Sequence, residues 1–334
     1  MPGGTIGIFS PSGALNTDRL TTAVATLEAQ GYHVKVAAAA TREWRYFAGP
    51  DNERAASFQQ MVADPSIDAM MMSRGGYGMS RLLHLVDWNA VAASAKVFCG
   101  FSDFTAFNCA ALAKANLITY AGPGAASDFD WRGDIADKTS DKTSDKTNDK
   151  TNDEISNNAA DHQFMAAHCW SALAGERISA GPYEVAHGTN GSNVTCSAHE
   201  YVSQEIVGPI FGSNLSLFSH LVGTPYLPHI DGGILFFEEI AEEPYAVERM
   251  LLQLFHAGIL QHQKALIFAD FTDCEPSSGR YAYTMAHVVE TMQTLLPYPV
   301  LTGLPFGHVA KKLTIPYGAE ATLKISDGSF WLSF

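Results

Sequence analysis

A serine stands where a short apolar run ends and a helix-compatible segment begins. The run is Val97-Phe-Cys-Gly100, and Phe101, Ser102 and Asp103 follow it. A serine at a strand-to-helix junction can expose its hydroxyl while backbone N–H groups of the first helical turn point at the group it attacks. The pattern is Gly-x-Ser-Asp, not the Gly-x-Ser-x-Gly of the common hydrolase elbow. Taken alone, these residues are explained more simply as a helix cap formed by Ser102 or Asp103.

A serine hydroxyl is a weak nucleophile, so serine catalysis needs a base, a group that orients the base, and donors for the oxyanion. Among twelve histidines, His308 differs because it follows Gly303-Leu-Pro-Phe-Gly307, a rigid loop whose glycines allow close backbone approach. The alternative is a histidine that only fills a turn. This loop therefore offers a candidate base.

Two carboxylates follow the apolar run 233–237 and are candidates for the orienting group. Glu238 and Glu239 end what we expect to be a strand, where a buried carboxylate is costly without a partner. Side chains alternate along a strand, so only one of the two can face a shared cleft. The alternative is that both are solvated charges at the end of the strand.

The sequence shows no motif typical of a metal site or of a phosphate-binding loop. No His, Cys, Asp or Glu spacing is typical of a metal site, so we expect no metal and no cofactor. The segment Arg74-Gly-Gly-Tyr-Gly78 is rich in glycine but lacks both phosphate-loop spacings. It is better suited to supply backbone N–H groups near Ser102. The five cysteines are scattered and indicate neither a zinc site nor a disulfide framework: Cys99, Cys109, Cys169, Cys196 and Cys274.

Charge and composition narrow the classes of partner. The formal net charge of −14 over 334 residues argues against nucleic acid and anionic membranes. No apolar stretch approaches the length that spans a bilayer, and the first residues lack the features of a signal peptide. We therefore expect a cytoplasmic protein. An anionic ligand would need a local arginine or lysine to hold it.

The apolar runs that must position these groups alternate with helix-length segments. Runs at 5–9, 33–36, 70–73, 98–100 and 117–120 predict strands, and Asn16 or Thr17 can cap the first helix. This alternation is typical of an α/β fold with a doubly wound, mostly parallel sheet. Ligands of such sheets bind beyond the carboxyl ends of the strands, where glycine-rich turns at 74–78 and 122–124 follow two of the runs.

A low-complexity segment divides the chain. Residues 137–152 are four copies of Asp-Lys-Thr-Ser/Asn without any apolar side chain, which predicts a disordered insertion. We expect an N-terminal α/β domain at 1–136, the insertion at 137–161 and a linker at 162–205. A β-rich α/β domain is expected at 206–334. It contains strands at 233–237 and 265–268 and a helix from Pro244, with strand-like runs at 321–325 and 330–334.

The chain resembles the bacterial LD-carboxypeptidases, the muramoyltetrapeptide carboxypeptidases, a serine peptidase family that also includes the microcin C immunity peptidases. The resemblance runs from residue 6 nearly to the C-terminus. The motifs that carry it are Ile6-Gly-Ile-Phe-Ser-Pro-Ser-Gly13, Phe47-Ala-Gly49, Arg74-Gly-Gly-Tyr-Gly78, Ser80-Arg-Leu-Leu83, Gly100-Phe-Ser-Asp-Phe-Thr105, Gly212-Ser-Asn-Leu215, Gly223-Thr-Pro225, Phe236-Phe-Glu-Glu-Ile240, Val247-Glu-Arg-Met-Leu251 and Gly303-Leu-Pro-Phe-Gly-His308.

The resemblance implies a Ser-His-Glu triad, with Ser102 as nucleophile, Glu238 as orienting group and His308 as general base. The backbone N–H of Asp103, with one from Gly75 or Gly76, would form the oxyanion hole. The two departures are Gly212-Ser-Asn in place of a double-glycine form and the insertion, and neither touches the implied triad.

The implied reaction is removal of the terminal D-Ala from the murein tetrapeptide L-Ala-γ-D-Glu-meso-diaminopimelate-D-Ala, in cytoplasmic recycling of the cell wall. The implied architecture is commonly a homodimer, with the active site between the two domains of each chain. Two rival functions stay open. One is an immunity-type peptidase acting on a peptidyl-nucleotide, and the other is a catalytically silent protein that binds murein peptides.

Substrate recognition is expected to need a cation, because the tetrapeptide and the protein are both acidic. Tyr77 and Asn214, in glycine-flanked loops, are expected polar contacts, although both could simply stabilise turns. The candidates for holding a substrate carboxylate are Arg74, Arg81, Arg249 and one of Lys311 and Lys312. For Arg81 and Arg249 a surface ion pair is the simpler role.

Overall fold

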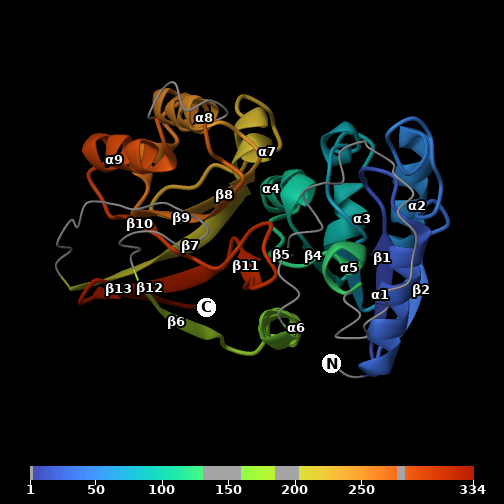
Figure 1. The fold of residues 1–334 in the computed structure, drawn as a ribbon. Coiled ribbons are helices and arrows are strands. Elements are labelled where there is room, and N and C mark those ends of the chain that lie inside the picture. Colours follow the sequence, from blue (N-terminus) through green and yellow to red (C-terminus); the bar gives the residue numbers. More distant parts are fainter. Residues whose placement is uncertain (1–2, 131–158, 185–202, 277–282) are drawn as a thin grey trace.

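The computed structural model describes residues 3–130, 159–184, 203–276 and 283–334. Within these ranges the chain forms two sheets that lie beside each other, each covered by helices (Figure 1). This confirms the expected two-part α/β fold. The repeats at 137–152 lie outside the described residues, as does the expected insertion at 137–161 up to residue 158, whereas residues 159–161 begin α6 (Ala159–Leu173).

The first sheet is mostly parallel. Among the described residues its strand order is β11-β5-β4-β3-β1-β2, and only the β11–β5 pair is antiparallel. The carboxyl ends of its parallel strands therefore share one edge, where Ser102 follows β4. The strands are β1 (Thr5–Phe9), β2 (His33–Val36), β3 (Ala69–Met72), β4 (Val97–Gly100), β5 (Thr119–Ala121) and β11 (Ile315–Tyr317).

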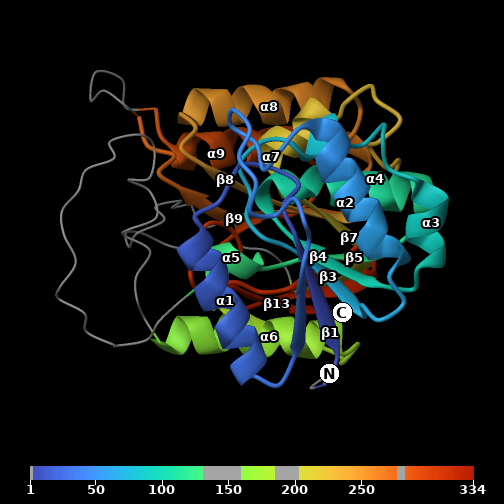
Figure 2. The same cartoon turned by 90° about the vertical axis from the view of Figure 1, so that its right-hand side faces the viewer.

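Helices cover both faces of this sheet because the strands are apolar on both sides. Met70 and Met72 pack in one cluster with Phe58 of α2, whereas Met71 packs in a second cluster with Leu20 of α1. Figure 2 shows α1, α5 and α6 on one side and α2, α3 and α4 on the other. The helices are α1 (Thr17–Ala29), α2 (Asp51–Ala63), α3 (Trp88–Ala93), α4 (Thr105–Ala115), α5 (Ala125–Asp128) and α6 (Ala159–Leu173).

The second sheet is mixed. Its order among the described residues is β10-β9-β8-β7-β12-β13-β6, with parallel pairing from β7 to β10 and antiparallel pairing from β7 through β12 and β13 to β6. Figure 1 shows α7, α8 and α9 above the parallel half. The elements are β6 (Ser179–Glu184), β7 (Gln204–Asn214), α7 (Leu215–His220), β8 (Ile234–Ile240), α8 (Pro244–His256), β9 (Ala265–Thr272), α9 (Met285–Leu295), β10 (Val300–Thr302), β12 (Glu320–Ser326) and β13 (Ser329–Ser333).

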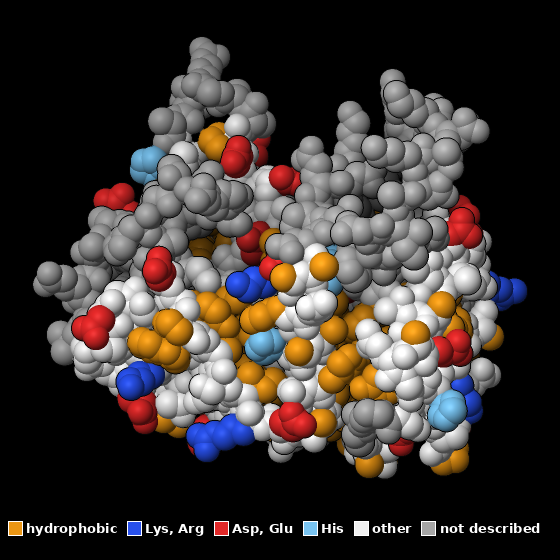
Figure 3. Space-filling model, turned by 60° about the horizontal axis from the view of Figure 1, so that its bottom comes forward, with side chains coloured by type: hydrophobic (Ala, Val, Ile, Leu, Met, Phe, Trp, Pro, Cys, Tyr) orange, Lys and Arg blue, Asp and Glu red, His pale blue; other side chains and the backbone are white. Residues whose placement is uncertain are grey.

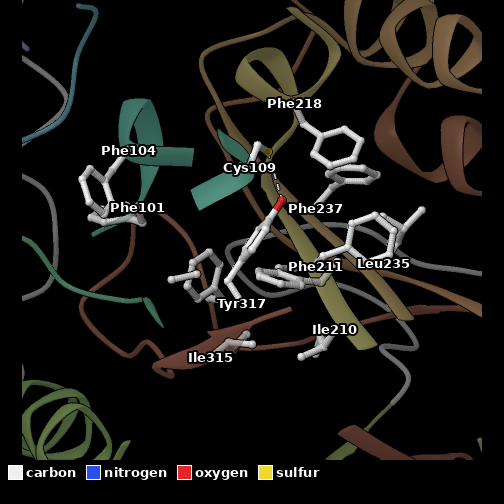
Figure 4. Close-up of a cluster of buried hydrophobic side chains, with 14 of the residues drawn as sticks. Phe101, Phe104, Cys109, Ile210, Phe211, Phe218, Leu235, Phe237, Ile315 and Tyr317 are labelled. Carbon is white, nitrogen blue, oxygen red and sulfur yellow. Dashed lines mark hydrogen bonds between the residues drawn. The ribbon is translucent and has the colours of Figure 1, made fainter. Parts of the chain in front are cut away.

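One buried core joins the two sheets. Tyr317 of β11 is fully buried between them, and its hydroxyl lies 3.0 Å from Cys109 Sγ of α4 (Figure 4). Phe211 of β7 and Phe237 of β8 belong to the same cluster. The backbone N–H of Asn214 also donates to Thr105 Oγ1 of α4, at 3.1 Å. The two halves are thus held in a fixed relation by packing and hydrogen bonds.

Several expected boundaries differ from the structure. β8 continues to Ile240, one residue beyond the two glutamates that were expected to end it, and Asn214 is the last residue of β7 rather than part of a loop. The physical reason is pairing, because β8 is flanked by β7 and β9 along most of its length. The stretch expected as a linker at 162–205 supplies most of α6 to the first half and β6 to the second.

The cap expected for the first helix is confirmed. Asn16 Oδ1 accepts a hydrogen bond from the backbone N–H of Asp18 at 2.7 Å, and α1 begins at Thr17. Among the described residues, no helix combines the length and the apolar character needed to span a membrane.

Candidate active site

The strand-to-helix junction holds Ser102 in a strained conformation. β4 ends at Gly100, and a short 3₁₀ turn over Ser102–Phe104 leads directly into α4. Ser102 has φ +57°, in the left-handed region that costs a non-glycine residue roughly 1–2 kcal/mol. Such strain persists where the surroundings impose it, and it is frequent at functional sites. The sharp turn directs the Ser102 side chain toward the second half of the chain.

Three side chains from distant parts of the sequence form a hydrogen-bonded series. His308 Nε2 lies 3.2 Å from Ser102 Oγ, and His308 Nδ1 lies 2.8 Å from Glu238 Oε2. The Glu238 side chain is fully buried, and 18% of the His308 side chain is exposed. With Nδ1–H donating to the carboxylate, Nε2 is free to accept the serine proton. The arrangement can therefore support general-base activation of a hydroxyl.

A glycine allows the His308 loop, residues 303–314, to approach β8. Gly307 has φ +135°, and a β-carbon there would lie 3.1 Å from Asp270 Cβ and 3.2 Å from Glu238 Cβ. The base of the loop is closed by a hydrogen bond from Leu313 N–H to Pro305 O, at 2.8 Å. This is the close backbone approach that the glycines in the sequence predict.

The neighbouring glutamate has different partners. Glu239 Oε1 accepts from Asn214 Nδ2 at 3.0 Å, and Glu239 Oε2 accepts from Ser216 N–H at 2.7 Å and from Ser216 Oγ at 2.5 Å. Burial, and secondarily the charge of Glu238, raise the pKa of Glu239. Both carboxylates are at least 97% buried, so the alternative that they are solvated strand-end charges is wrong.

The glycine-rich turn after β3 lies against the serine. A β-carbon on Gly75 would lie 2.8 Å from Ser102 Oγ and 2.9 Å from Ser102 Cβ, and 3.8 Å from the backbone nitrogen of Asp103. Gly76 has φ +108°, and a β-carbon there would collide with the Tyr46 hydroxyl. The structure thus brings Gly75 and Asp103 to the serine. Their role as an oxyanion hole stays a prediction.

The side chain of Asp103 is a feature that the sequence did not reveal. Asp103 Oδ2 accepts from Ser12 Oγ at 2.5 Å and from Met79 N–H at 2.7 Å, whereas Oδ1 accepts no hydrogen bond from the part of the chain that the structure describes. Burial raises the pKa of this carboxyl to about 6. Its acceptor bonds tie the loops after β1 and β3 to the serine turn. The residue after Ser102 is therefore a structural anchor.

A buried arginine reinforces these loops. The Arg54 guanidinium donates to Gly49 O at 3.1 Å, to Gly78 O at 3.3 Å and to Pro11 O, and it forms an ion pair with Asp51. A signal for it existed in the sequence, because Arg54 lies on the apolar face of a helix where a charge needs partners.

The expected substrate contacts lie in different surroundings. Arg74 Nη1 donates to Ala14 O at 3.1 Å. Tyr77 is 48% exposed, with its ring 5.9 Å from that of Phe47. Asn214 is 2% exposed and caps α7 by accepting from Leu217 N–H at 3.1 Å. Contact of these three side chains with a substrate stays a prediction.

The other candidate cations are dispersed. Arg81 forms an ion pair with Asp51 at 2.6 Å, which is the simpler role anticipated for it. Arg249 is exposed on α8, and the Lys311 ammonium lies 5.2 Å from the centroid of the Phe164 ring. Lys312 is buried and paired with Asp128, so it does not face a substrate.

The described ranges contain no group of three or more His, Cys, Asp and Glu side chains that could hold a metal ion.

Figure 3 shows the lower face of the molecule, where apolar side chains lie between scattered charges. A separate cleft of about 470 Å³ lies between α6, β11 and β13, and its lining includes Tyr120, Arg177 and Phe334. None of Ser102, Glu238 and His308 lines it.

Comparison with known protein families identifies the class. The LD-carboxypeptidase N-terminal domain matches residues 6–122, and the LD-carboxypeptidase C-terminal domain matches residues 207–323. The chain belongs to the LD-carboxypeptidase family of peptidases, which confirms the resemblance carried by the sequence motifs.

Individual relatives match over nearly the whole chain. The crystal structure of muramoyltetrapeptide carboxypeptidase from Oxalobacter formigenes is 32% identical, covers 98% of each chain and has a TM-score of 0.80. A probable murein peptide carboxypeptidase of Bacillus subtilis is 27% identical over 97% of this chain and 90% of its own length. The microcin C7 self-immunity protein of Escherichia coli is 26% identical over 96% of this chain and 90% of its own length.

Proposed function

We propose that this protein is a serine LD-carboxypeptidase that removes the terminal D-Ala from murein tetrapeptides. The observation that carries the proposal is the series of two hydrogen bonds from Ser102 through His308 to Glu238, at 3.2 and 2.8 Å. The substrate class is supported by relatives that are named muramoyltetrapeptide and murein peptide carboxypeptidases. The natural setting would be cytoplasmic recycling of cell-wall peptides by a homodimer.

The first half of the reaction forms an acyl-enzyme. His308 Nε2 takes the proton of Ser102 as Oγ attacks the carbonyl carbon of the diaminopimelate residue. Backbone N–H groups of Asp103 and of Gly75 or Gly76 would stabilise the oxyanion. His308 then gives its proton to the nitrogen of D-Ala, which leaves as the free amino acid. Throughout, the Glu238 carboxylate orients the imidazole and stabilises its charged form.

The second half restores the enzyme. Water enters as D-Ala departs, and His308 Nε2 takes one of its protons as the oxygen attacks the ester carbonyl. The ester bond to Ser102 Oγ breaks, and His308 returns the proton to that oxygen. The products are D-Ala and a tripeptide with a new carboxylate. All the protons pass through one imidazole.

The terminal carboxylate of the substrate needs a cation near Ser102, because the net charge of −14 repels an anionic peptide. Arg74 is the proposed cation, since it directly precedes Gly75, whose α-carbon lies against the serine side chain. Tyr77 and Asn214 are proposed as polar contacts.

A second candidate function is favoured by the 26% identity to the microcin C7 self-immunity protein. In that case the same serine would cleave an aminoacyl or peptidyl group from a nucleotide. A catalytically silent binding protein is a weaker candidate, since binding alone requires no hydrogen-bonded Ser-His-Glu series.

The test is mass-spectrometric detection of D-Ala from L-Ala-γ-D-Glu-meso-diaminopimelate-D-Ala. Wild type should release D-Ala, and Ser102→Ala should lower the rate by roughly a thousandfold or more. Ser94→Ala is the matched control, since Ser94 Oγ donates to Val91 O and accepts from Lys96 N–H, both between α3 and the start of β4.

Release by both wild type and Ser102→Ala would remove Ser102 from its role. No release by either would favour the peptidyl-nucleotide substrate, which is assayed in parallel. Light scattering of the purified protein tests the homodimer.

A further inference from the structure

Lys312 is a buried lysine on the loop that carries the proposed base. It lies four residues beyond His308, and only 2% of its side chain is exposed. Its ammonium lies 2.5 Å from Asp128 Oδ1 on α5, so the ion pair crosses from the second half of the chain to the first. An ammonium removed from water needs a partner in good geometry, and here the Asp128 carboxylate is that partner.

Asp128 is itself held rigidly. Its other oxygen, Oδ2, accepts from Gly124 N–H and from Ser127 Oγ, both at 2.8 Å. The short helix α5 is tied to the turn after β3, because Ala126 N–H donates to Ser73 O at 2.8 Å. Ser73 is followed by Arg74 and then by Gly75. Asp128, the partner of Lys312, is therefore anchored to the edge of the first sheet. The glycine-rich turn 74–78, which lies against Ser102, starts from the same edge.

The ammonium of Lys312 also contacts the residue before the nucleophile. It lies 3.9 Å from the centroid of the Phe101 ring, and that ring lies 5.1 Å from the ring of His308. The Phe101 ring thus contacts both the ammonium and the imidazole. Any shift of Lys312 would disturb both Phe101, which is bonded to Ser102, and the loop that carries His308.

We infer that the Lys312–Asp128 pair is a positioning device that fastens the His308 loop to the first half of the chain. It sets the distance between His308 Nε2 and Ser102 Oγ, which belong to different halves. Neither side chain touches the substrate in this scheme. The inference rests on the proposed function, since it concerns the geometry of the same serine and histidine.

The experiment is a double-mutant cycle on the full-length protein, measured as D-Ala release from the tetrapeptide. Lys312→Met and Asp128→Asn should each lower kcat by roughly 10- to 100-fold and leave KM within about threefold, because a misplacement of about 1 Å is enough for such a loss. The double variant should be no slower than the slower single variant. Lys312→Arg retains the charge and should therefore keep a higher kcat than Lys312→Met. If Lys312→Met does not fold, Lys312→Arg is measured in its place.

Lys96→Met is the matched control for loss of a buried ammonium. Lys96 is 7% exposed and donates to Asp64 O and Ile67 O at 2.6 Å, at the opposite end of β4 from Ser102. This variant should lose thermal stability while kcat stays within about twofold of wild type.

Three results would overturn the positioning role. They are an unchanged kcat in Lys312→Met, a rise in KM alone, or a kcat loss of the same size in Lys96→Met. Losses that multiply in the double variant would show that the two residues act separately, which also contradicts it.

Labelling by a fluorophosphonate separates this inference from the proposed function. That reagent needs the Ser102–His308 pair but no murein peptide. If wild type is labelled but releases no D-Ala, the substrate assignment fails, and the labelling rates of the same variants then test the positioning role.

Discussion

Glu238 and Glu239 are adjacent in β8, yet their carboxylates face opposite sides of the strand and have separate partners. Glu238 accepts from the His308 imidazole, whereas Glu239 is held by Asn214 and Ser216 at the start of α7. The alternation of side chains along a strand separates the two groups. One carboxylate belongs to the candidate active site and the other to the packing that supports it.

The same substitution at the two positions should therefore have different effects. Glu238→Gln should lower kcat by roughly 100-fold or more, because the imidazolium formed in the reaction loses its counter-charge. Glu239→Gln should lower the free energy of unfolding by about 1–3 kcal/mol, because an amide NH₂ group would face hydrogen-bond donors of Ser216. D-Ala release and urea denaturation measure the two effects. Equal loss of kcat in both variants would contradict this division.

Gly75→Ala should damage the site without unfolding the protein. The new β-carbon would meet Ser102 Oγ at 2.8 Å and Ser102 Cβ at 2.9 Å, and rotation of the serine can relieve only the first contact. We expect kcat to fall by roughly 100-fold, as for a reacting group displaced by about 1 Å. Gly258→Ala is the control. That glycine has φ +80° and open space around it, so the control should cost stability and leave kcat unchanged. Normal kinetics for Gly75→Ala would show that the serine is not confined there.

Asp103 should make stability fall with rising pH. Its pKa is raised by burial from 3.8 to about 6, so the folded state holds the proton more tightly than the unfolded state. Its stabilising contribution is complete below pH 3.8 and is lost as pH rises to about 6. Relative to Asp103→Asn, the unfolding free energy of wild type should fall by about 2 kcal/mol between pH 4.5 and 7.0. Urea denaturation of both proteins at each pH measures this difference, and parallel curves would refute it.

The described cysteines should be inert in the folded protein. Burial raises the pKa of Cys109 and that of Cys274 to about 12. The pKa of Cys99 lies well above its ordinary value, because of its hydrogen bond with Cys169 first and of burial second. Reaction of a thiol with Ellman's reagent requires the thiolate. A Cys196→Ser variant, which removes the thiol outside the described residues, should show four reactive thiols only after denaturation. Its D-Ala release should survive treatment with iodoacetamide. Loss of activity under these conditions would point to a cysteine nucleophile instead.

Much of the fold could be predicted because its signals are local. Apolar runs at strand and helix spacing predicted β1 and β2 at their observed bounds and the other predicted strands with shifts in their ends. The alternation of strands and helices was enough to predict the parallel sheet. The stretch 162–205, predicted as a linker, contributes most of α6 to the first half and β6 to the second. These contacts join residues far apart in the sequence, so local patterns do not reveal them.

The sequence by itself determined which chemical groups the chain carries, their order, and the family to which it belongs. Only the tertiary structure decided that Ser102 adopts φ +57°, that Gly75 lies against it, that Asp103 is a buried anchor and that Lys312 reaches Asp128. The physical reason is sequence separation. Periodicity encodes contacts within one element, whereas the contacts between Ser102 and His308 and between Asp128 and Lys312 span 206 and 184 residues. Such contacts exist only once two sheets have packed against each other around β11 and its buried Tyr317.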